Sequence, residues 1–122
     1  MLLRLLTSMG FLLTLGASTA NADGDAAHGQ EIYESRCIAC HSVDANRVGP
    51  RHRGVFGRPA GSLGDYNYSK ALKAAKFTWS AETLDKWLTN PQAFVPGQKM
   101  NFKVNDPQDR ADIIAYLKTL SE

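Results

Sequence analysis

Residues 37–41 read Cys37-Ile38-Ala39-Cys40-His41, and this stretch decides what kind of domain the chain forms. Two thiols three positions apart lie on one face of a helical turn, so both can reach the same flat ligand. Each thiol can add to a vinyl group of one porphyrin, and His41 is then placed beneath the ring, where its imidazole can bind the iron. The C-x-x-C-H pattern therefore predicts covalent attachment of a haem.

Three other interpretations of the cysteine pair are weaker. A redox-active dithiol of the thioredoxin type is expected beside a βαβ pattern, and none is visible. A zinc site needs further ligands, and neither His28 nor His52 has the spacing of a zinc finger or knuckle. A disulfide between Cys37 and Cys40 would close a very short loop, so it would stabilise the fold little.

The first 22 residues have the features of a secretory signal peptide. Arg4 precedes a largely apolar run over residues 5–17, and Ala20-Asn21-Ala22 is a small-x-small cleavage pattern. The alternative is an uncleaved membrane anchor, but crossing a bilayer takes about 20 predominantly apolar residues, and this run is shorter. We therefore expect cleavage after residue 22, a single monohaem domain over residues 23–122, and a periplasmic location in a Gram-negative bacterium.

Charge and composition limit the possible partners. The chain is 43% hydrophobic and 21% charged, which indicates a globular protein, and its length suits one domain. Of the 14 Lys and Arg residues, cleavage after residue 22 removes Arg4 alone, and it removes none of the 12 acidic residues. The remaining balance of 13 basic against 12 acidic side chains gives no support to nucleic-acid binding.

The rest of the chain predicts an all-α domain. Capping residues and apolar spacing predict helices over 26–39, 69–75, 81–88 and from Asp106 or Pro107 to about residue 120, with Asp25 as the first N-cap. Ser80 and Thr83 form a variant of the capping box, and Pro91 is expected to close the region that follows. Loops rich in Gly and Pro cover residues 48–64 and 90–105, and no useful alternating strand pattern occurs.

Met100 ends the tight segment Pro96-Gly97-Gln98-Lys99-Met100. A thioether is a soft, neutral iron ligand that raises the reduction potential when it lies opposite a histidine. Taken alone, a methionine is most often an ordinary apolar residue. Two of the three methionines fall within the expected signal peptide, however, so Met100 would be the only one left in the mature chain. Beside the C-x-x-C-H motif, this favours Met100 as the second iron ligand.

These features resemble the class I c-type cytochromes, a family that includes mitochondrial cytochrome c and its bacterial periplasmic relatives. The resemblance extends from about Gly29 to Leu120. Its motifs occur in the order of the family, and as a set they are specific: Cys37 to His41, Gly49-Pro50, Gly54-Val55-Phe56-Gly57-Arg58, Tyr68, Thr78-Trp79, Asn90-Pro91, Pro96 to Met100 with Phe102, and Ile113 to Lys118.

The resemblance implies a cytochrome c fold, in which about four to five short helices and long loops wrap around one covalent haem c. His41 and Met100 would ligate the iron, and the Pro50 carbonyl would accept the other imidazole N–H of His41. The cofactor-binding set that the resemblance implies also includes Lys99 and three residues that would hydrogen-bond the haem propionates, namely Arg58, Tyr68 and Trp79. Gly29 and Tyr33 of the first helix would meet Ile113 and Tyr116 of the last.

Three positions depart from the familiar pattern. Trp87 stands where the mitochondrial protein has a tyrosine near the methionine sulfur. Gln98 replaces a threonine that helps to hold a propionate. His52 falls where an aliphatic residue is usual, and we interpret it as a satisfied loop histidine without a role in ligation.

The resemblance implies a one-electron carrier and not an enzyme, because two protein ligands leave the iron without a site for substrate. Its partners would be redox proteins such as a membrane cytochrome complex or an oxidase. The carrier would act as a monomer without stable membrane insertion, docking through basic residues around the haem edge: Arg36, Lys86, Lys99 and Lys103. Two alternatives stay open: a dedicated electron-acceptor subunit of a periplasmic dehydrogenase, and a peroxidase-like or gas-binding haem protein in which Met100 does not ligate.

Overall fold

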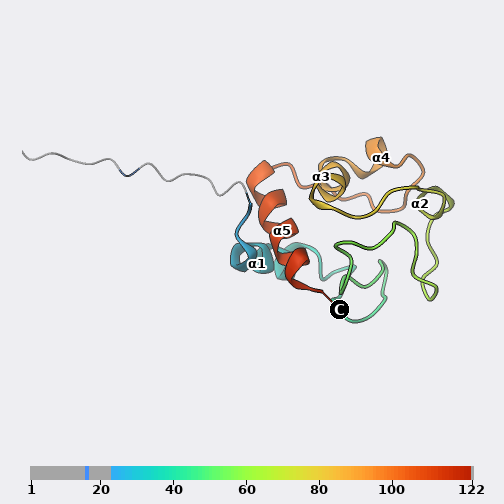
Figure 1. The fold of residues 1–122 in the computed structure, drawn as a ribbon, viewed down its shortest axis with the longest axis horizontal. Helices are drawn as coiled ribbons and strands as arrows, with labels where there is room; N and C mark the ends of the chain where they lie inside the picture. The colour runs from blue at the N-terminus through green and yellow to red at the C-terminus, as the bar shows by residue number, and fades with distance from the viewer. Residues whose placement is uncertain (1–15, 17–22, 122) are drawn as a thin grey trace, which may run out of the picture.

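The computed structural model describes residue 16 and residues 23–121, and this part of the chain forms five helices joined by long loops (Figure 1). The helices are α1 (Ala26–Arg36), α2 (Lys70–Lys73), α3 (Ala81–Thr89), α4 (Pro91–Phe94) and α5 (Pro107–Thr119). Among the described residues, the β-structure consists of an isolated antiparallel bridge between Pro59 and Thr78. The all-α class expected from the sequence is confirmed. The expected signal peptide lies outside the described residues, apart from Gly16.

The helices begin at the expected caps. The Asp25 side chain accepts hydrogen bonds from the backbone N–H groups of Ala27 and His28. Ser80 and Thr83 form a reciprocal capping box at the start of α3. Asp106 caps α5. These side chains satisfy backbone donors that have no partner within a helix, which is why the starts could be read from local sequence.

Three expected helix boundaries were wrong. The helix expected over 69–75 spans only Lys70–Lys73, with Ser69 as its N-cap. The first helix was expected to reach residue 39, but α1 ends at Arg36 because the chain turns there, and the N–H groups of Cys40 and His41 both donate to the Cys37 carbonyl. Pro91 was expected to close the region after the third helix. It instead opens α4, where proline is tolerated because its missing N–H would have had no helical partner.

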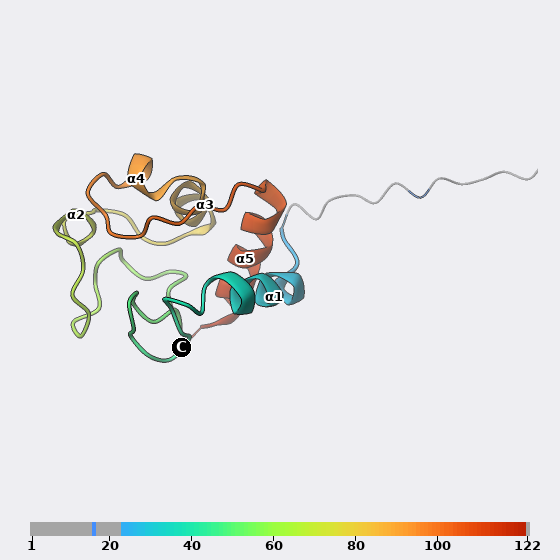
Figure 2. The same cartoon turned by 180° about the vertical axis from the view of Figure 1, so that it is seen from behind.

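Helices α1 and α5 cross in direct backbone contact, as Figures 1 and 2 show. A methyl group built on Gly29 would lie 1.9 Å from the carbonyl oxygen of Asp112 and 3.0 Å from the backbone nitrogen of Ile113. The rings of Tyr33 and Tyr116 pack beside this crossing, with their centroids 5.3 Å apart. The expected meeting of the first and last helices is therefore confirmed.

The buried carboxylate of Asp112 ties the start of α1 to α5. It accepts hydrogen bonds from the Asp25 backbone N–H at 2.7 Å and from the Gln108 side chain at 2.8 Å, and its Oδ2 lies 2.6 Å from Nδ1 of His28. Burial raises the pKa of this carboxyl group, but the hydrogen bonds from His28, Asp25 and Gln108 outweigh it, so the pKa is lowered overall. The same contact raises the pKa of His28, mainly through the hydrogen bond to Asp112.

We expect this contact to lose its stabilising effect as the pH rises above neutrality. The pKa of folded His28 is raised, so its contribution is complete below the usual histidine pKa of about 6.5 and disappears as the pH rises through the raised value. Melting temperatures of the wild type and His28→Gln, compared between about pH 5.5 and pH 9, should differ most at the acidic end and converge at the alkaline end. The effect should be small because the His28 side chain is 48% exposed. A difference that is constant across this range would show that the charge of His28 does not matter.

The hydrophobic core lies between two groups of segments. Residues 37–69 lie on the side of α1, whereas α3, α4 and residues 95–105 lie on the other side (Figures 1 and 2). The buried apolar side chains come from both groups and from α5; they include Val55, Leu84, Leu88, Val104, Ile113 and Leu117. In the described part of the chain, no helix combines the length and the apolar character needed to cross a membrane.

Candidate haem site

A cavity of about 480 Å³ lies between these two groups of segments. Its volume is in the range of cofactor pockets, and most of its walls are apolar. The site residues predicted from the sequence converge on it: Cys37, Cys40, His41, Pro50, Arg58, Tyr68, Trp79, Lys99 and Met100 all line the cavity. The fold thus brings together residues that are up to 63 positions apart along the chain.

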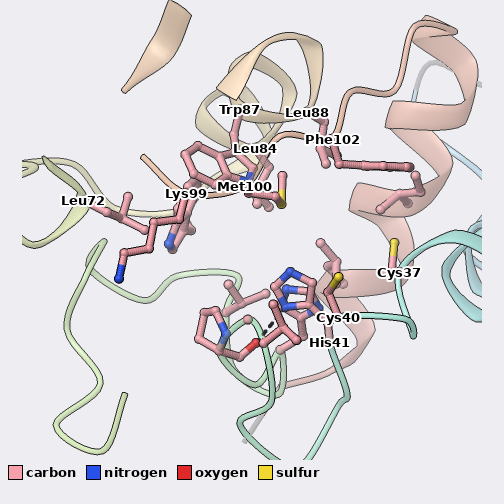
Figure 3. A pocket seen from close by; sticks show the side chains of 18 of the residues that line it. Cys37, Cys40, His41, Leu72, Leu84, Trp87, Leu88, Lys99, Met100 and Phe102 are labelled. Carbon is pink, nitrogen blue, oxygen red and sulfur yellow. Dashed lines mark hydrogen bonds between the residues drawn. The ribbon is translucent and has the colours of Figure 1, made fainter. Parts of the chain in front are cut away.

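The two cysteines stand at one edge of the cavity, on the turn that follows α1 (Figure 3). Burial raises the pKa of the Cys37 thiol to about 11. A redox-active dithiol has the opposite property, a depressed pKa that keeps a thiolate at neutral pH. The environment of Cys37 therefore argues against a thioredoxin-like role for the pair.

His41 is prepared to act as a metal ligand. Its Nδ1 lies 2.9 Å from the Pro50 carbonyl oxygen, so the contact expected from the resemblance is confirmed. Because a carbonyl only accepts, Nδ1 carries the proton, and Nε2 keeps its lone pair for an iron atom. Burial lowers the pKa of His41, and Arg47 adds to this effect while the Pro50 bond opposes it. A neutral imidazole is the form that binds metals.

The ring of His41 is enclosed by two neighbours. A methyl group built on Gly49 would lie 2.2 Å from Cε1 of His41, so only glycine leaves room for the ring. The imidazole of His52 stacks on it, with the centroids 4.0 Å apart and the planes 21° apart. Nδ1 of His52 lies 2.9 Å from the Tyr33 hydroxyl. The expectation of a satisfied loop histidine is correct for the hydrogen bond of His52, but its contact with His41 was not expected.

Arg47 is a second residue that sequence reasoning missed. Its guanidinium donates hydrogen bonds to the carbonyl oxygens of Ile38 and His41, the latter at 3.3 Å. These bonds brace the turn that carries the cysteines and His41. No spacing rule pointed to Arg47, because a surface arginine in a loop is usually solvated.

Met100 lies across the cavity from His41, on the loop that follows α4 (Figure 3). The loop reverses direction at Gly97, whose φ of 91° is in the left-handed region that favours glycine. Trp87 of α3 lies beside Met100 in Figure 3 and contacts Trp79 edge to face, with a centroid distance of 5.3 Å. Trp87 replaces the tyrosine of the mitochondrial protein, and the side of the cavity near Met100 therefore keeps an aromatic side chain.

Polar groups that could bind carboxylates occupy another part of the wall. The Arg58 guanidinium donates to the carbonyl oxygens of Arg51 at 3.1 Å and Arg53 at 2.5 Å, which holds it in place. The Tyr68 hydroxyl accepts a hydrogen bond from the Leu63 N–H at 3.2 Å, so its own proton is left for an acceptor. Gln98 is buried, and its Oε1 has no hydrogen-bond partner within the described residues.

The donor set fits a covalently attached haem. Two thiols stand on one edge, a neutral imidazole with a free lone pair faces a thioether, and apolar walls line the space between them. A haem needs this combination, because its ring is apolar while its iron and propionates are not. The residues present therefore match the group that the motif predicts.

Known proteins of similar sequence and structure agree with this chemistry. The sequence model of the family described as "Cytochrome c" matches residues 26–121. The cytochrome c of Euglena viridis is 46% identical over 102 residues, which are 81% of this chain and 100% of that protein. The cytochrome c2 of Rhodomicrobium vannielii is 45% identical over 107 residues, which are 84% of this chain and 85% of that protein.

Among solved structures, cytochrome cH from Methylobacterium extorquens superposes with a TM-score of 0.75 at 46% identity, covering 79% of this chain and 99% of that one. This match confirms the expected cytochrome c fold. With the C-x-x-C-H turn and the cavity it lines, the chain thus belongs to the cytochrome c family and is an electron carrier whose haem c is attached through Cys37 and Cys40.

Proposed function

We propose that this protein is a periplasmic one-electron carrier whose haem iron is ligated by His41 and Met100. The observation that carries the proposal is the His41 ring, which has Nδ1 bonded to the Pro50 carbonyl and faces Met100 across the cavity (Figure 3). The haem, when bound, takes up and gives up one electron at its iron. Two neutral protein ligands leave no open coordination position, which suits electron transfer better than binding of peroxide or a gas.

The polar part of the wall supports a role for Arg58, Tyr68 and Trp79 in binding the haem propionates. A buried carboxylate without partners costs several kcal/mol or more, so it needs donors of this kind. Arg58 is already held by two backbone carbonyls, and the Tyr68 hydroxyl proton is available. Lys99, next to Met100, is exposed where the cavity opens and adds a positive charge at that edge.

The optical spectrum of the purified holoprotein tests the ligation. A ferric haem with a methionine–iron bond has a weak charge-transfer band at long wavelength, and we expect this band in the oxidised protein. A c-type haem spectrum without the band would remove Met100 from the iron and favour the ligand-binding or enzymatic alternative.

Docking to redox partners should depend on basic residues near the haem edge. Lys99 and Lys103 are exposed, and no ion pair is recorded for either within the described structure, whereas Lys86 pairs with Glu82 at 3.0 Å and Arg36 with Asp109 at 3.6 Å. Pairs at the surface are weak, so all four side chains still contribute positive potential. Of the exposed apolar side chains, Val48 and Phe102 line the cavity, as Arg36 and Lys99 do.

We expect the association rate with an acidic redox partner to fall about tenfold or more from low to physiological ionic strength. At low ionic strength, Lys99→Gln should reduce this rate about two- to threefold, because Lys99 is exposed and lines the cavity, and charges at the rim act mainly on association. Lys118→Gln is the matched control: this lysine of α5 lies over the Phe56 ring, does not line the haem cavity, and should have little effect. Stopped-flow electron-transfer rates provide the measurement. A rate insensitive to salt would argue against electrostatic steering.

The periplasmic location rests on the signal-peptide features of residues 1–22. Protein isolated from a periplasmic fraction should therefore have an N-terminus at Asp23. Co-purification with a dehydrogenase in stoichiometric amounts would instead favour the role of a dedicated electron-acceptor subunit over that of a free carrier.

A further inference from the structure

His52 makes two contacts that no simple packing role requires. Its ring stacks nearly parallel on that of His41, at a centroid distance of 4.0 Å and an angle of 21°. Its Nδ1 lies 2.9 Å from the hydroxyl of Tyr33, and the two rings meet edge to face at 5.5 Å. The imidazole is therefore held both by its face and by its edge.

The His41 ring needs more than its hydrogen bond to keep one orientation. The contact between Nδ1 and the Pro50 carbonyl fixes one atom, but the ring can still tilt about that point. Gly49 approaches the ring at Cε1, and His52 covers a face of it. Because the two rings lie at stacking distance, a tilt of His41 toward His52 would bring their ring atoms into overlap.

The position of His52 is itself set by the helix crossing. Tyr33 is buried on α1, with 2% of its surface exposed, and its ring packs on Tyr116 of α5 at 5.3 Å. The hydroxyl that bonds His52 is thus anchored in the α1–α5 contact. A chain of three side chains, Tyr33, His52 and His41, connects that contact to the cavity.

We propose that His52 is a positioning residue for His41, which holds the plane of the ligand ring and favours the oxidised state of the haem. The inference rests on the proposed ligation by His41. An imidazole bound to ferric iron carries more positive charge than one bound to ferrous iron, and the π face of a neutral aromatic neighbour stabilises positive charge. Burial lowers the pKa of His52 well below its usual value, with smaller contributions from His41 and Arg58.

Reduction potentials and proton NMR spectra of the ferric holoprotein test this role. The hyperfine shifts of the haem methyl groups depend on the plane of the axial histidine, so they report a change that mere loss of stability would not cause. His52→Leu removes the ring at similar volume. Tyr33→Phe removes only the hydroxyl that anchors His52. Phe94→Leu is the matched control, because it also replaces a partly buried ring by leucine, at a position that does not line the cavity.

We expect His52→Leu to raise the potential, shifting the equilibrium constant for oxidation about two- to fivefold toward the ferrous form, and to change the methyl shift pattern. Tyr33→Phe should cause a smaller change in the same direction, and the double variant should match His52→Leu, because Tyr33 acts through His52. Phe94→Leu should leave both readouts unchanged.

Unchanged potential and methyl shifts in His52→Leu, with or without a lower melting temperature, would overturn the proposal and leave His52 as a packing residue. If His52→Leu yields no folded holoprotein, Tyr33→Phe decides, and unchanged shifts there would overturn the proposal equally. The long-wavelength band is recorded first in the wild type. If the wild type lacks the band, the proposed ligation by Met100 is wrong. If the wild type has the band but His52→Leu leaves the reduction potential unaltered, only the proposed role of His52 is wrong.

Discussion

Replacement of Met100 by alanine is expected to lower the reduction potential by on the order of a tenth of a volt or more, within the ~0.8 V range that axial ligands set in haem proteins. The thioether is a soft, neutral donor that favours ferrous iron, and alanine offers no donor in its place. The change should also abolish the long-wavelength band and open a coordination position. Potentiometric titration and binding of added imidazole measure the two effects.

The covalent haem provides the control for this variant. The haem is attached through Cys37 and Cys40, which lie far from Met100 in the sequence. Met100→Ala should therefore keep its haem during denaturing electrophoresis. The double variant Cys37→Ala with Cys40→Ala should lose its haem under the same conditions. If Met100→Ala had the wild-type potential and did not bind imidazole, another residue would hold the sixth position, and the proposed ligation would be wrong.

Replacement of Gly29 by alanine should destabilise the protein by roughly 1–3 kcal/mol, the usual cost of overpacking a tight contact. In an isolated helix the same change would stabilise by about 1 kcal/mol, because alanine is the better helix former. Here the added methyl group would meet the Asp112 carbonyl oxygen at 1.9 Å, and neither backbone can move without separating α1 from α5. For a domain of this size the melting temperature should fall by about 5–20 °C, which calorimetry of the holoprotein can measure.

Gly64→Ala is a suitable control for this experiment. A methyl group at Gly64 has no atom within 4 Å, and its φ is not in the left-handed region. It should change the stability by no more than about 0.5 kcal/mol. A Gly29→Ala protein as stable as the wild type would show that the two helices can separate without cost, contrary to the close crossing seen here.

Features that depend on neighbouring residues could be read from the sequence. The spacing of Cys37, Cys40 and His41 is a local matter, so the attachment of haem could be predicted from five residues. The helix starts followed from Asp25, Ser80 and Asp106 for the same reason, since a cap bonds to N–H groups two or three residues ahead. The predicted helix ends were less accurate than the predicted starts. The chain turns after Arg36, where it positions Cys37 and Cys40, although the local residues favour continuing the helix.

Features that join distant parts of the chain needed either the family resemblance or the structure. The contacts of His41 with Pro50 and of Gly29 with α5 were expected only because the motifs resembled known cytochromes. The departure at His52 had no counterpart in that pattern, so neither spacing nor resemblance could assign its neighbours. The bracing of the cysteine turn by Arg47 was missed for the same reason.

The helical class, the covalent haem and the likeness to a family of electron carriers could all be predicted from the chain alone, because they depend on residue types at short and regular spacing. The stacking of His52 on His41 and its hydrogen bond to Tyr33 became visible in the folded structure. Those contacts arise where the α1–α5 crossing meets the loop after the cysteines. Their geometry depends on how whole segments pack, which no local pattern of residues specifies.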